Sequence, residues 1–290
     1  HFVRAPFFCS GCPYNTALKL PADSTAFAGM GCHAMAMFYS SSTTMTCMQM
    51  GGEGANWMGL APFTTARHVF QNLGDGTYHH SGSLAIRASV AAGTNITYKI
   101  MVNGVIAMTG GQDIAGPLSV AAISNQIHHE GVRRIAVVSD QPSNHTASSG
   151  LAPGVEVHHR DEMDRVQRAM REIPGTTAII YEQACATNKR RLRKRGRYAD
   201  PPKRMFINKD VCEGCGDCSD QSNCLSVHPL ETELGLKRRI DQSSCNKDYS
   251  CVKGFCPSFV TVLGGELTRK AGVELDDDVF AALPAPRVAA

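Results

Sequence analysis

The 290-residue chain lacks features that would each have defined its class. No apolar run approaches the roughly 20 residues that a membrane helix needs, and no stretch has the pattern of a secretory signal peptide. The net charge is only +3, which gives no argument for nucleic-acid binding. A starting methionine is also missing. We therefore expect a cytoplasmic piece of a longer protein, with neither membrane nor nucleic acid as a partner.

Cysteine, in contrast, is abundant, with 12 residues in the chain. A secreted disulfide framework would favour a much shorter chain. Seven of the cysteines fall between Cys212 and Cys256, at spacings typical of metal ligands. The cysteine usage therefore favours a cytoplasmic metalloprotein.

One stretch has the order strand, glycine turn, helix, strand. Residues 68–73 form an apolar run that ends at Gly74-Asp75-Gly76, residues 81–92 have a helical pattern, and residues 96–102 form a second strand before Asn103. Such a unit places a diphosphate at the carboxyl edge of a parallel sheet. Asp75 and Asn103 each follow a strand, and Mg²⁺ prefers oxygen ligands together with phosphate oxygens. The alternative is an ordinary turn, since an isolated Gly-Asp-Gly is common.

Strands and helices continue to alternate up to residue 181. Helices are predicted over 117–130 and 160–172, and strands over 134–139 and 177–181. This alternation predicts an α/β fold with a mostly parallel sheet covered by helices. Cys47 lies in a strand-like run, where we expect it in the core.

Residues 203–265 carry the strongest signal and are called the cysteine-rich segment below. Cys212, Cys215 and Cys218 have the spacing Cys-x2-Cys-x2-Cys, and a remote Cys256-Pro257 supplies the usual fourth ligand of a [4Fe–4S] cluster. Zinc is the alternative for Cys-x2-Cys pairs. Zinc requires neither the third cysteine nor the Cys-Pro, so the pattern favours iron–sulfur in a small α+β ferredoxin-like domain.

The second half of this segment repeats the first with one change. Cys245 and Cys251 flank Asp248, which stands where the middle cysteine would be, and Cys224 takes the crossed fourth position. A carboxylate binds iron more weakly than a thiolate does. This second site could hold [4Fe–4S], [3Fe–4S] or nothing, and Asp248 could be only a surface acid.

Three further features are ambiguous. Cys9-x2-Cys12 could be a redox dithiol, half of a zinc site or two buried thiols. The basic run 189–198 is interpreted as a solvated linker, with attraction of an acidic ferredoxin or of coenzyme phosphates as the functional alternative. His79 and His80 follow the glycine turn and are hypothesised to line the active site.

Several motifs together resemble one family over residues 7–265. They are Cys-Ser-Gly-Cys-Pro, Gly-Asp-Gly-Thr-Tyr, Met-Thr-Gly-Gly-Gln, Cys-Glu-Gly-Cys-Gly-Asp-Cys and Cys-Val-Lys-Gly-Phe-Cys-Pro. The chain resembles the bacterial fused indolepyruvate ferredoxin oxidoreductases, which belong to the thiamine-diphosphate-dependent 2-oxoacid:ferredoxin oxidoreductases. The run Asn103-Gly-Val-Ile-Ala departs from the Asn-x-Val-Tyr-Gly of the wider superfamily, which affects the expected local cofactor contacts.

The resemblance implies specific site residues. Mg²⁺ would be held by Asp75, Asn103 and the carbonyl of Val105. Thiamine diphosphate would lie against Gly74, Asp75, Gly76, Asn103, Val105, Met108 and Thr109. A further [4Fe–4S] cluster would be bound by Cys9, Cys12, Cys32 and Cys185, which would bring the clusters to two or three.

The resemblance also implies a reaction and partners. A 2-oxoacid, expected to be an arylpyruvate such as indolepyruvate, would be oxidatively decarboxylated to an acyl-CoA, with electrons passing to ferredoxin. The family's catalytic glutamate sits on a pyrimidine-binding domain, and no candidate for it is found here, so we expect this piece to be inactive alone. A homo-oligomer is expected. The competing hypotheses are a non-catalytic electron-transfer module and a zinc-binding protein associated with nucleic acid.

These features divide the chain into four predicted parts. Residues 1–188 would bind the diphosphate and Mg²⁺, residues 189–202 would be a basic linker, residues 203–265 would carry the clusters, and residues 266–290 would be a tail.

Overall fold

The structure, a computed structural model, describes residues 6–38, 43–265 and 283–284. A seven-stranded sheet dominates it, and every pair of neighbouring strands is parallel. In spatial order the strands are β2 (Thr44–Cys47), β1 (Ala26–Ala28), β3 (Val69–Gly74), β4 (Ile96–Val102), β9 (Thr176–Glu182), β7 (Ile135–Ser139) and β8 (Glu156–His159). The predicted α/β fold with a mostly parallel sheet is confirmed.

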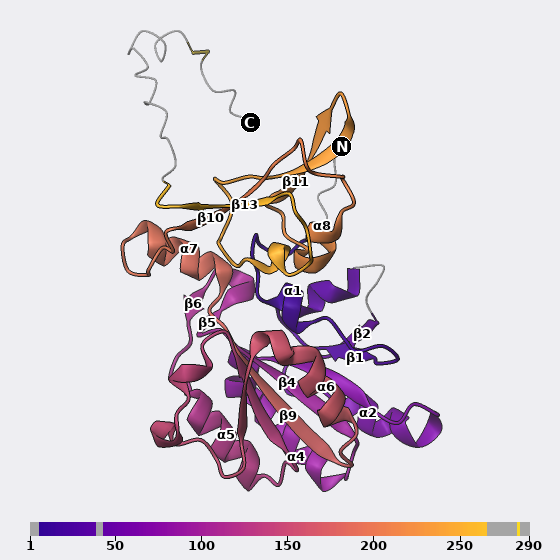
Figure 1. The fold of residues 1–290 in the computed structure, drawn as a ribbon. Helices are drawn as coiled ribbons and strands as arrows, with labels where there is room; N and C mark the ends of the chain where they lie inside the picture. Colours follow the sequence, from indigo (N-terminus) through magenta and orange to yellow (C-terminus); the bar gives the residue numbers. More distant parts are fainter. Residues whose placement is uncertain (1–5, 39–42, 266–282, 285–290) are drawn as a thin grey trace.

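Helices cover both faces of this sheet (Figure 1). One core joins the sheet to α2 (Ala55–Leu60), α4 (Ser83–Ala91) and α5 (Val120–His129), and the other joins it to α1 (Tyr14–Ala17) and α6 (Met163–Arg171). The central strands are buried on both faces, which explains their nearly continuous apolar sequences. A short hairpin, β5 (Val105–Ile106) with β6 (Gln112–Asp113), follows β4.

The helix after the glycine turn begins earlier than the sequence predicts. Gly74 is extended, α3 (Asp75–Thr77) starts at the next residue, and a π-helical turn over Tyr78–Gly82 leads into α4. Tyr78 is buried and donates to Gln126 Oε1 on α5 at 2.9 Å. The buried Tyr78 therefore stabilises the π-helical turn. Most of this turn lies before the helix that the sequence predicts over 81–92.

Two expectations about the chain are wrong. Cys47 is exposed rather than in the core, because β2 is an edge strand. The basic run is not a solvated linker over its first part, since α7 (Ala186–Lys194) is a helix with Lys189 buried. The guanidinium groups of α7 donate to backbone carbonyls instead of facing water only.

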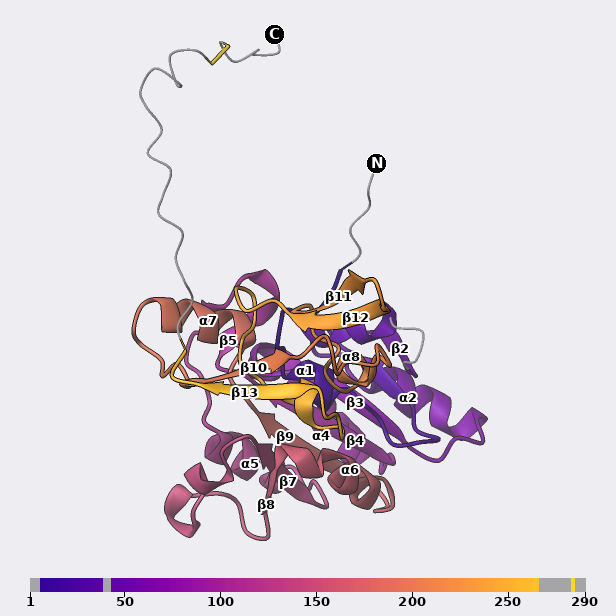
Figure 2. The same ribbon diagram turned by 45° about the horizontal axis from the view of Figure 1, so that its top comes forward.

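The cysteine-rich segment has two small antiparallel sheets and one helix. β10 (Lys203–Ile207) pairs with β13 (Phe259–Leu263), β11 (Val227–Thr232) pairs with β12 (Gly235–Ile240), and α8 (Asp217–Ser222) lies between β10 and β11 in the chain. Figures 1 and 2 show this orange and yellow part above the sheet, on the side where β9 leads into α7.

The predicted tail at 266–290 lies outside the described residues, apart from 283–284. Among the residues that the structure does describe, no helix combines the length and the apolar character that crossing a bilayer takes.

Candidate functional site

The turn after β3 and the turn after β4 are joined by one carboxylate. Asp75 is buried, its Oδ1 accepts from Gly76 N at 2.8 Å, and its Oδ2 accepts from Asn103 N at 2.8 Å and Gly104 N at 2.9 Å. Burial raises the pKa of Asp75, and these backbone N–H groups oppose that rise. The carboxylate is therefore fixed where the two strands end side by side.

Asn103 is oriented by two partners. Its Oδ1 accepts from Val105 N at 3.0 Å, and its Nδ2 donates to the hydroxyl of Tyr14 at 2.7 Å. A carboxylate and an amide oxygen thus lie at neighbouring strand ends, which is the donor chemistry that Mg²⁺ takes. The residues present fit a magnesium diphosphate.

Tyr14 was not singled out in the sequence, although it directly follows the Cys9-x2-Cys12-Pro13 motif. It is buried, and burial followed by the charge of Asp75 raises its pKa well above the usual value. The neutral phenol therefore remains a donor or acceptor at Asn103 over the whole physiological range. It links the first cysteine motif to the diphosphate turn.

The other predicted cofactor residues surround these turns. Gly74 and Gly76 have open space, because a β-carbon at either would meet only side chains at 3.7 to 3.8 Å. Val105 is buried on β5, while Met108 and Thr109 are exposed on a short turn that Thr109 and Gln112 close by hydrogen bonds. His79 and His80 are exposed on the π-helical turn.

A second set of buried polar groups lies beside the same turn. Three buried side chains of this set have polar atoms without a hydrogen-bond partner among the described residues. These atoms are Glu53 Oε1, both amide atoms of Asn72 and both ring nitrogens of His33. Burial lowers the pKa of His33 to about 4, so its ring is neutral. A β-carbon at Gly74 would lie 3.8 Å from His33 Cε1, so this ring borders the turn. Apart from its place after Gly31-Cys32, no pattern in the sequence singles out His33.

The four cysteines that the family resemblance groups together line one cavity. Cys9, Cys12, Cys32 and Cys185 share it with Tyr14 and Asn103. Burial, then the charges of Cys185 and Cys9, raise the pKa of Cys32 to about 11, and the pKa of Cys12 is raised further by burial and by the other three. With pKa values raised in this way, Cys12 and Cys32 are neutral thiols at physiological pH unless a cationic partner is present.

The first cysteine group of the cysteine-rich segment lines a cavity of about 300 Å³. Cys212, Cys215, Cys218 and Cys256 are all on its wall. Gly214 N donates to Cys212 Sγ at 3.4 Å, an arrangement suited to a thiolate ligand. Gly214 has φ of +72°, and a β-carbon there would lie 2.1 Å from the carbonyl oxygen of Leu236. The glycine inside this motif is therefore required by the fold.

The second predicted group comprises Cys224, Cys245, Asp248 and Cys251. Burial, followed by the charges of Cys224, Cys245 and Cys218, raises the pKa of Cys251 to about 12. Cys224 Sγ accepts from Ser226 N at 3.4 Å and, across to the first motif of the chain, from Gly11 N at 3.2 Å. Asp248 is buried elsewhere, in an ion pair with Arg160 of the α/β part.

Within the described residues, no group of three or more His, Cys, Asp or Glu side chains is gathered tightly enough to hold a single metal ion. The cysteine groups line cavities rather than converge on a point.

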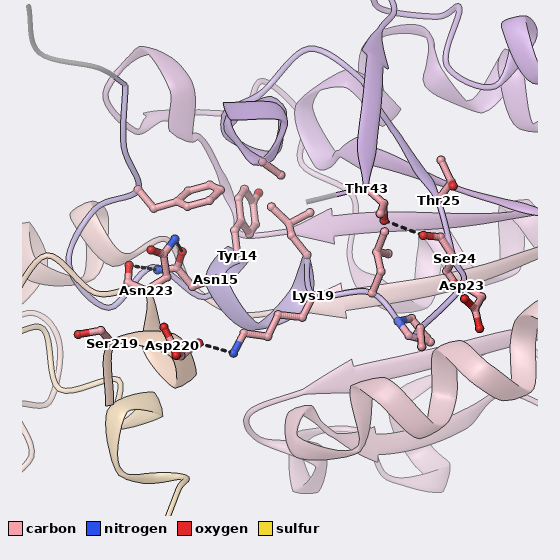
Figure 3. Close-up of a pocket in the computed structure, with 16 residues that line it drawn as sticks. Tyr14, Asn15, Lys19, Asp23, Ser24, Thr25, Thr43, Ser219, Asp220 and Asn223 are labelled. Carbon is pink, nitrogen blue, oxygen red and sulfur yellow. Dashed lines mark hydrogen bonds between the residues drawn. The ribbon is translucent and has the colours of Figure 1, made fainter. Parts of the chain in front are cut away.

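Polar contacts join the cysteine-rich segment to α1 near a cavity of about 910 Å³ (Figure 3). Lys19 Nζ donates to the carbonyls of Asp220 and Gln221, and Asn15 exchanges hydrogen bonds with Asn223. The charged end of Lys19 is therefore used for docking at this cavity.

The family comparison agrees with this geometry. The model of the thiamine pyrophosphate enzyme, C-terminal TPP binding domain, matches residues 29–181. This range includes every strand of the seven-stranded sheet except β1 and the last residue of β9. The chain belongs to this family of thiamine-diphosphate-binding domains.

Curated relatives narrow the class. Indolepyruvate oxidoreductase subunit IorA of Pyrococcus horikoshii and that of Pyrococcus abyssi are each 23% identical over 285 residues, which is 91% of this chain and 42% of theirs. The chain thus spans less than half the length of these relatives. They confirm the resemblance to the indolepyruvate ferredoxin oxidoreductases that the motifs indicated.

Among solved structures, a 2-oxoglutarate:ferredoxin oxidoreductase from Magnetococcus marinus, with 2-oxoglutarate, coenzyme A and succinyl-CoA bound, has 19% sequence identity. Its TM-score is 0.49, and the match covers 64% of this chain and 66% of that one.

Proposed function

We propose that the chain is the thiamine-diphosphate-binding and electron-accepting part of a 2-oxoacid:ferredoxin oxidoreductase. One observation carries this proposal. The cavity lined by Cys9, Cys12, Cys32 and Cys185 is also lined by Asn103, the amide at the diphosphate turn. An electron acceptor in that cavity would lie directly beside the cofactor.

At the diphosphate turn, Asp75, Asn103 and the carbonyl of Val105 would hold Mg²⁺, and the backbone of Gly74 and Gly76 leaves room for phosphate oxygens. When bound, thiamine diphosphate would supply a nucleophilic carbon for the 2-oxo group and a thiazolium ring as the sink for the electron pair that remains when CO₂ leaves. Met108 and Thr109 would cover the cofactor from the β5–β6 hairpin. Tyr14 positions the Asn103 amide through its hydroxyl group.

The three cysteine groups would form an electron path that leads away from the cofactor. The Cys9–Cys12 loop contacts Cys224 through the Gly11 N–H, and Cys218 lies close enough to Cys251 to raise its pKa. Electrons would therefore pass through the second cysteine group to the Cys212, Cys215, Cys218 and Cys256 group, and from there to a soluble ferredoxin. The cysteine-rich segment would be a ferredoxin-like domain.

The whole enzyme includes more than this chain. A pyrimidine-binding domain of the same longer chain would supply the activating glutamate, and a second copy would complete the assembly. The substrate is an arylpyruvate such as indolepyruvate, and coenzyme A accepts the acyl group. The chain would divide into the four parts 1–188, 189–202, 203–265 and 266–290, with α7 running across the first boundary.

The test combines metal analysis and calorimetry on anaerobically purified protein. We expect about 8 to 12 irons per chain with matching acid-labile sulfide, from two or three clusters, and binding of thiamine diphosphate that requires Mg²⁺. Clusters without cofactor binding would instead favour a non-catalytic electron-transfer module. Zinc without labile sulfide would overturn the proposal.

A further inference from the structure

Asp248 stands at the middle ligand position of the second cysteine motif, yet its carboxylate is occupied by the α/β part. Its Oδ1 accepts from Arg160 Nη1 at 2.5 Å and from Gln183 Nε2 at 3.2 Å, while Ser250 donates to Oδ2. The Arg160 guanidinium also donates through Nη2 to the Asp248 carbonyl at 2.7 Å. Both carboxylate oxygens of Asp248 are therefore engaged in hydrogen bonds within the protein, and one of them is bound by the α/β part.

Arg160 depends on this contact. Its side chain is 9% exposed and that of Asp248 is 6% exposed, so the pair is removed from water. Turning the carboxylate toward Cys224, Cys245 and Cys251 would leave a buried guanidinium without its carboxylate, which is strongly unfavourable. Gln183 is fixed in turn by the Tyr181 hydroxyl at 2.7 Å, so the network is anchored on β9.

The loop that carries Asp248 also packs against the first cysteine motif. A β-carbon at Gly11 would lie 3.0 Å from Asp248 Cβ and 3.2 Å from Asn246 Cβ, and Gly11 N donates to Cys224. The backbone around Asp248 is thus enclosed between the Cys9–Cys12 loop and Arg160. There is little room for it to turn.

We propose that the second iron–sulfur site is a three-cysteine site holding [3Fe–4S], because Asp248 serves as the interdomain partner of Arg160 and not as an iron ligand. The three thiolates are Cys224, Cys245 and Cys251. This inference rests on the proposed iron–sulfur function, and it decides between the alternatives that the motif leaves open. It also gives Asp248 a positioning role. Through Arg160, Asp248 would hold the second cluster of the cysteine-rich segment near the Cys9–Cys12 loop.

Two variants of the full chain separate docking from ligation. Asp248→Asn removes the carboxylate, and Arg160→Met removes its partner with an apolar side chain of similar length. Arg168→Met is the matched control. Arg168 and Asp164 form an exposed ion pair within α6, the helix that follows Arg160 in the chain. Each protein is purified without oxygen and analysed by iron and sulfide content, EPR and hydrogen exchange.

We expect the unmodified protein and both variants to show the same three-iron EPR signal after oxidation, with unchanged iron content. In both variants the Gly11 amide should exchange at least about tenfold faster, because a buried ion pair across the interface is lost. The control should exchange like the unmodified protein.

The inference is overturned if Asp248→Asn alters the second cluster's spectrum or iron count while Arg160→Met does not, since that pattern identifies a ligand. A second cluster that is four-iron in all three proteins also overturns it. Complete absence of labile sulfide is a different outcome, because it removes the proposed function itself.

Discussion

The two halves of the proposed electron path are stabilised in different ways. The α/β part has a seven-stranded sheet with an apolar core on each face, and its diphosphate turn is fixed by backbone hydrogen bonds to Asp75. The cysteine-rich segment has a core cluster of five buried residues, Met205, Ile207, Cys212, Cys218 and Ile240. Two of those five, Cys212 and Cys218, are predicted cluster ligands, so the apolar core and the predicted cluster site share residues.

This difference indicates what each part needs in order to fold. We expect a sheet buried on both faces to retain its structure without ligands, whereas a segment of roughly 60 residues is only marginally stable by itself. Its remaining support comes from polar contacts to the α/β part, such as Lys19 to α8 and Arg160 to Asp248. We therefore expect the site on the sheet to be preformed, and the proposed cluster sites to depend on metal and docking.

The largest effect is expected from removing iron. Chelation under reducing conditions should unfold the cysteine-rich segment and leave the sheet intact, because metal binding supplies the folding free energy of small metal domains. Hydrogen exchange should show loss of protection in β10 and β13 while β3, β4 and β9 stay protected. Equal protection of both parts after chelation would remove the contrast between them.

Next in size is the loss of the Asp75 carboxylate. Asp75→Ala should weaken Mg²⁺-dependent thiamine diphosphate binding by at least about 100-fold, since changes even around the ligands of a metal typically cost 10- to 100-fold. Calorimetry measures it, with the exposed Asp113→Ala as the control. Binding should also weaken as the pH falls through the raised pKa of Asp75, because the protonated carboxyl cannot ligate. Unchanged affinity would remove Asp75 from the site.

A smaller effect concerns the core of the sheet. Lys99 is fully buried, donates to the Ala17 carbonyl and to Gln167 Oε1, and burial lowers its pKa to about 7. Between pH 7 and the ordinary lysine pKa of 10.5, Lys99 is therefore protonated in the unfolded chain and neutral in the folded one. The free energy of unfolding should therefore rise with pH across that window, by up to about 1.4 kcal/mol per pH unit.

Denaturant unfolding at several pH values measures this dependence. It is done on the iron-depleted protein, in which we expect the cysteine-rich segment to be unfolded already, so that only unfolding of the α/β part is followed. Lys99→Met should lose the slope, and the exposed Lys209→Met should keep it. A slope that persists in Lys99→Met would mean that another group causes it.

The smallest effect concerns the contact between the two parts. Gly11→Ala should weaken docking by about 1 to 2 kcal/mol, because alanine is strained at φ of +64° and its β-carbon would meet Asp248. Gly93→Ala is the matched control, with φ of +61° and no neighbour within 4 Å. Exchange of the Ser226 amide, beside Cys224, reports the docking. Equal behaviour of the two variants would show that strain alone acts at Gly11.

The sequence by itself determined the α/β class, the turn at Gly74-Asp75-Gly76 and the spacing of the cysteine motifs. These depend on local patterns, such as buried strands with continuous apolar runs and glycines at sharp turns. It also indicated that Asp75 and Asn103 lie at adjacent strand ends, and the parallel register of β3 and β4 does bring them together.

Only the tertiary structure decided which distant residues meet. It joined Tyr14 to Asn103, made the basic run a docking helix and placed Cys47 on an exposed edge. It also turned Asp248 toward Arg160, 88 positions away in the chain. Such pairings depend on packing and on the need to neutralise buried charges, and neither leaves a pattern in the local sequence.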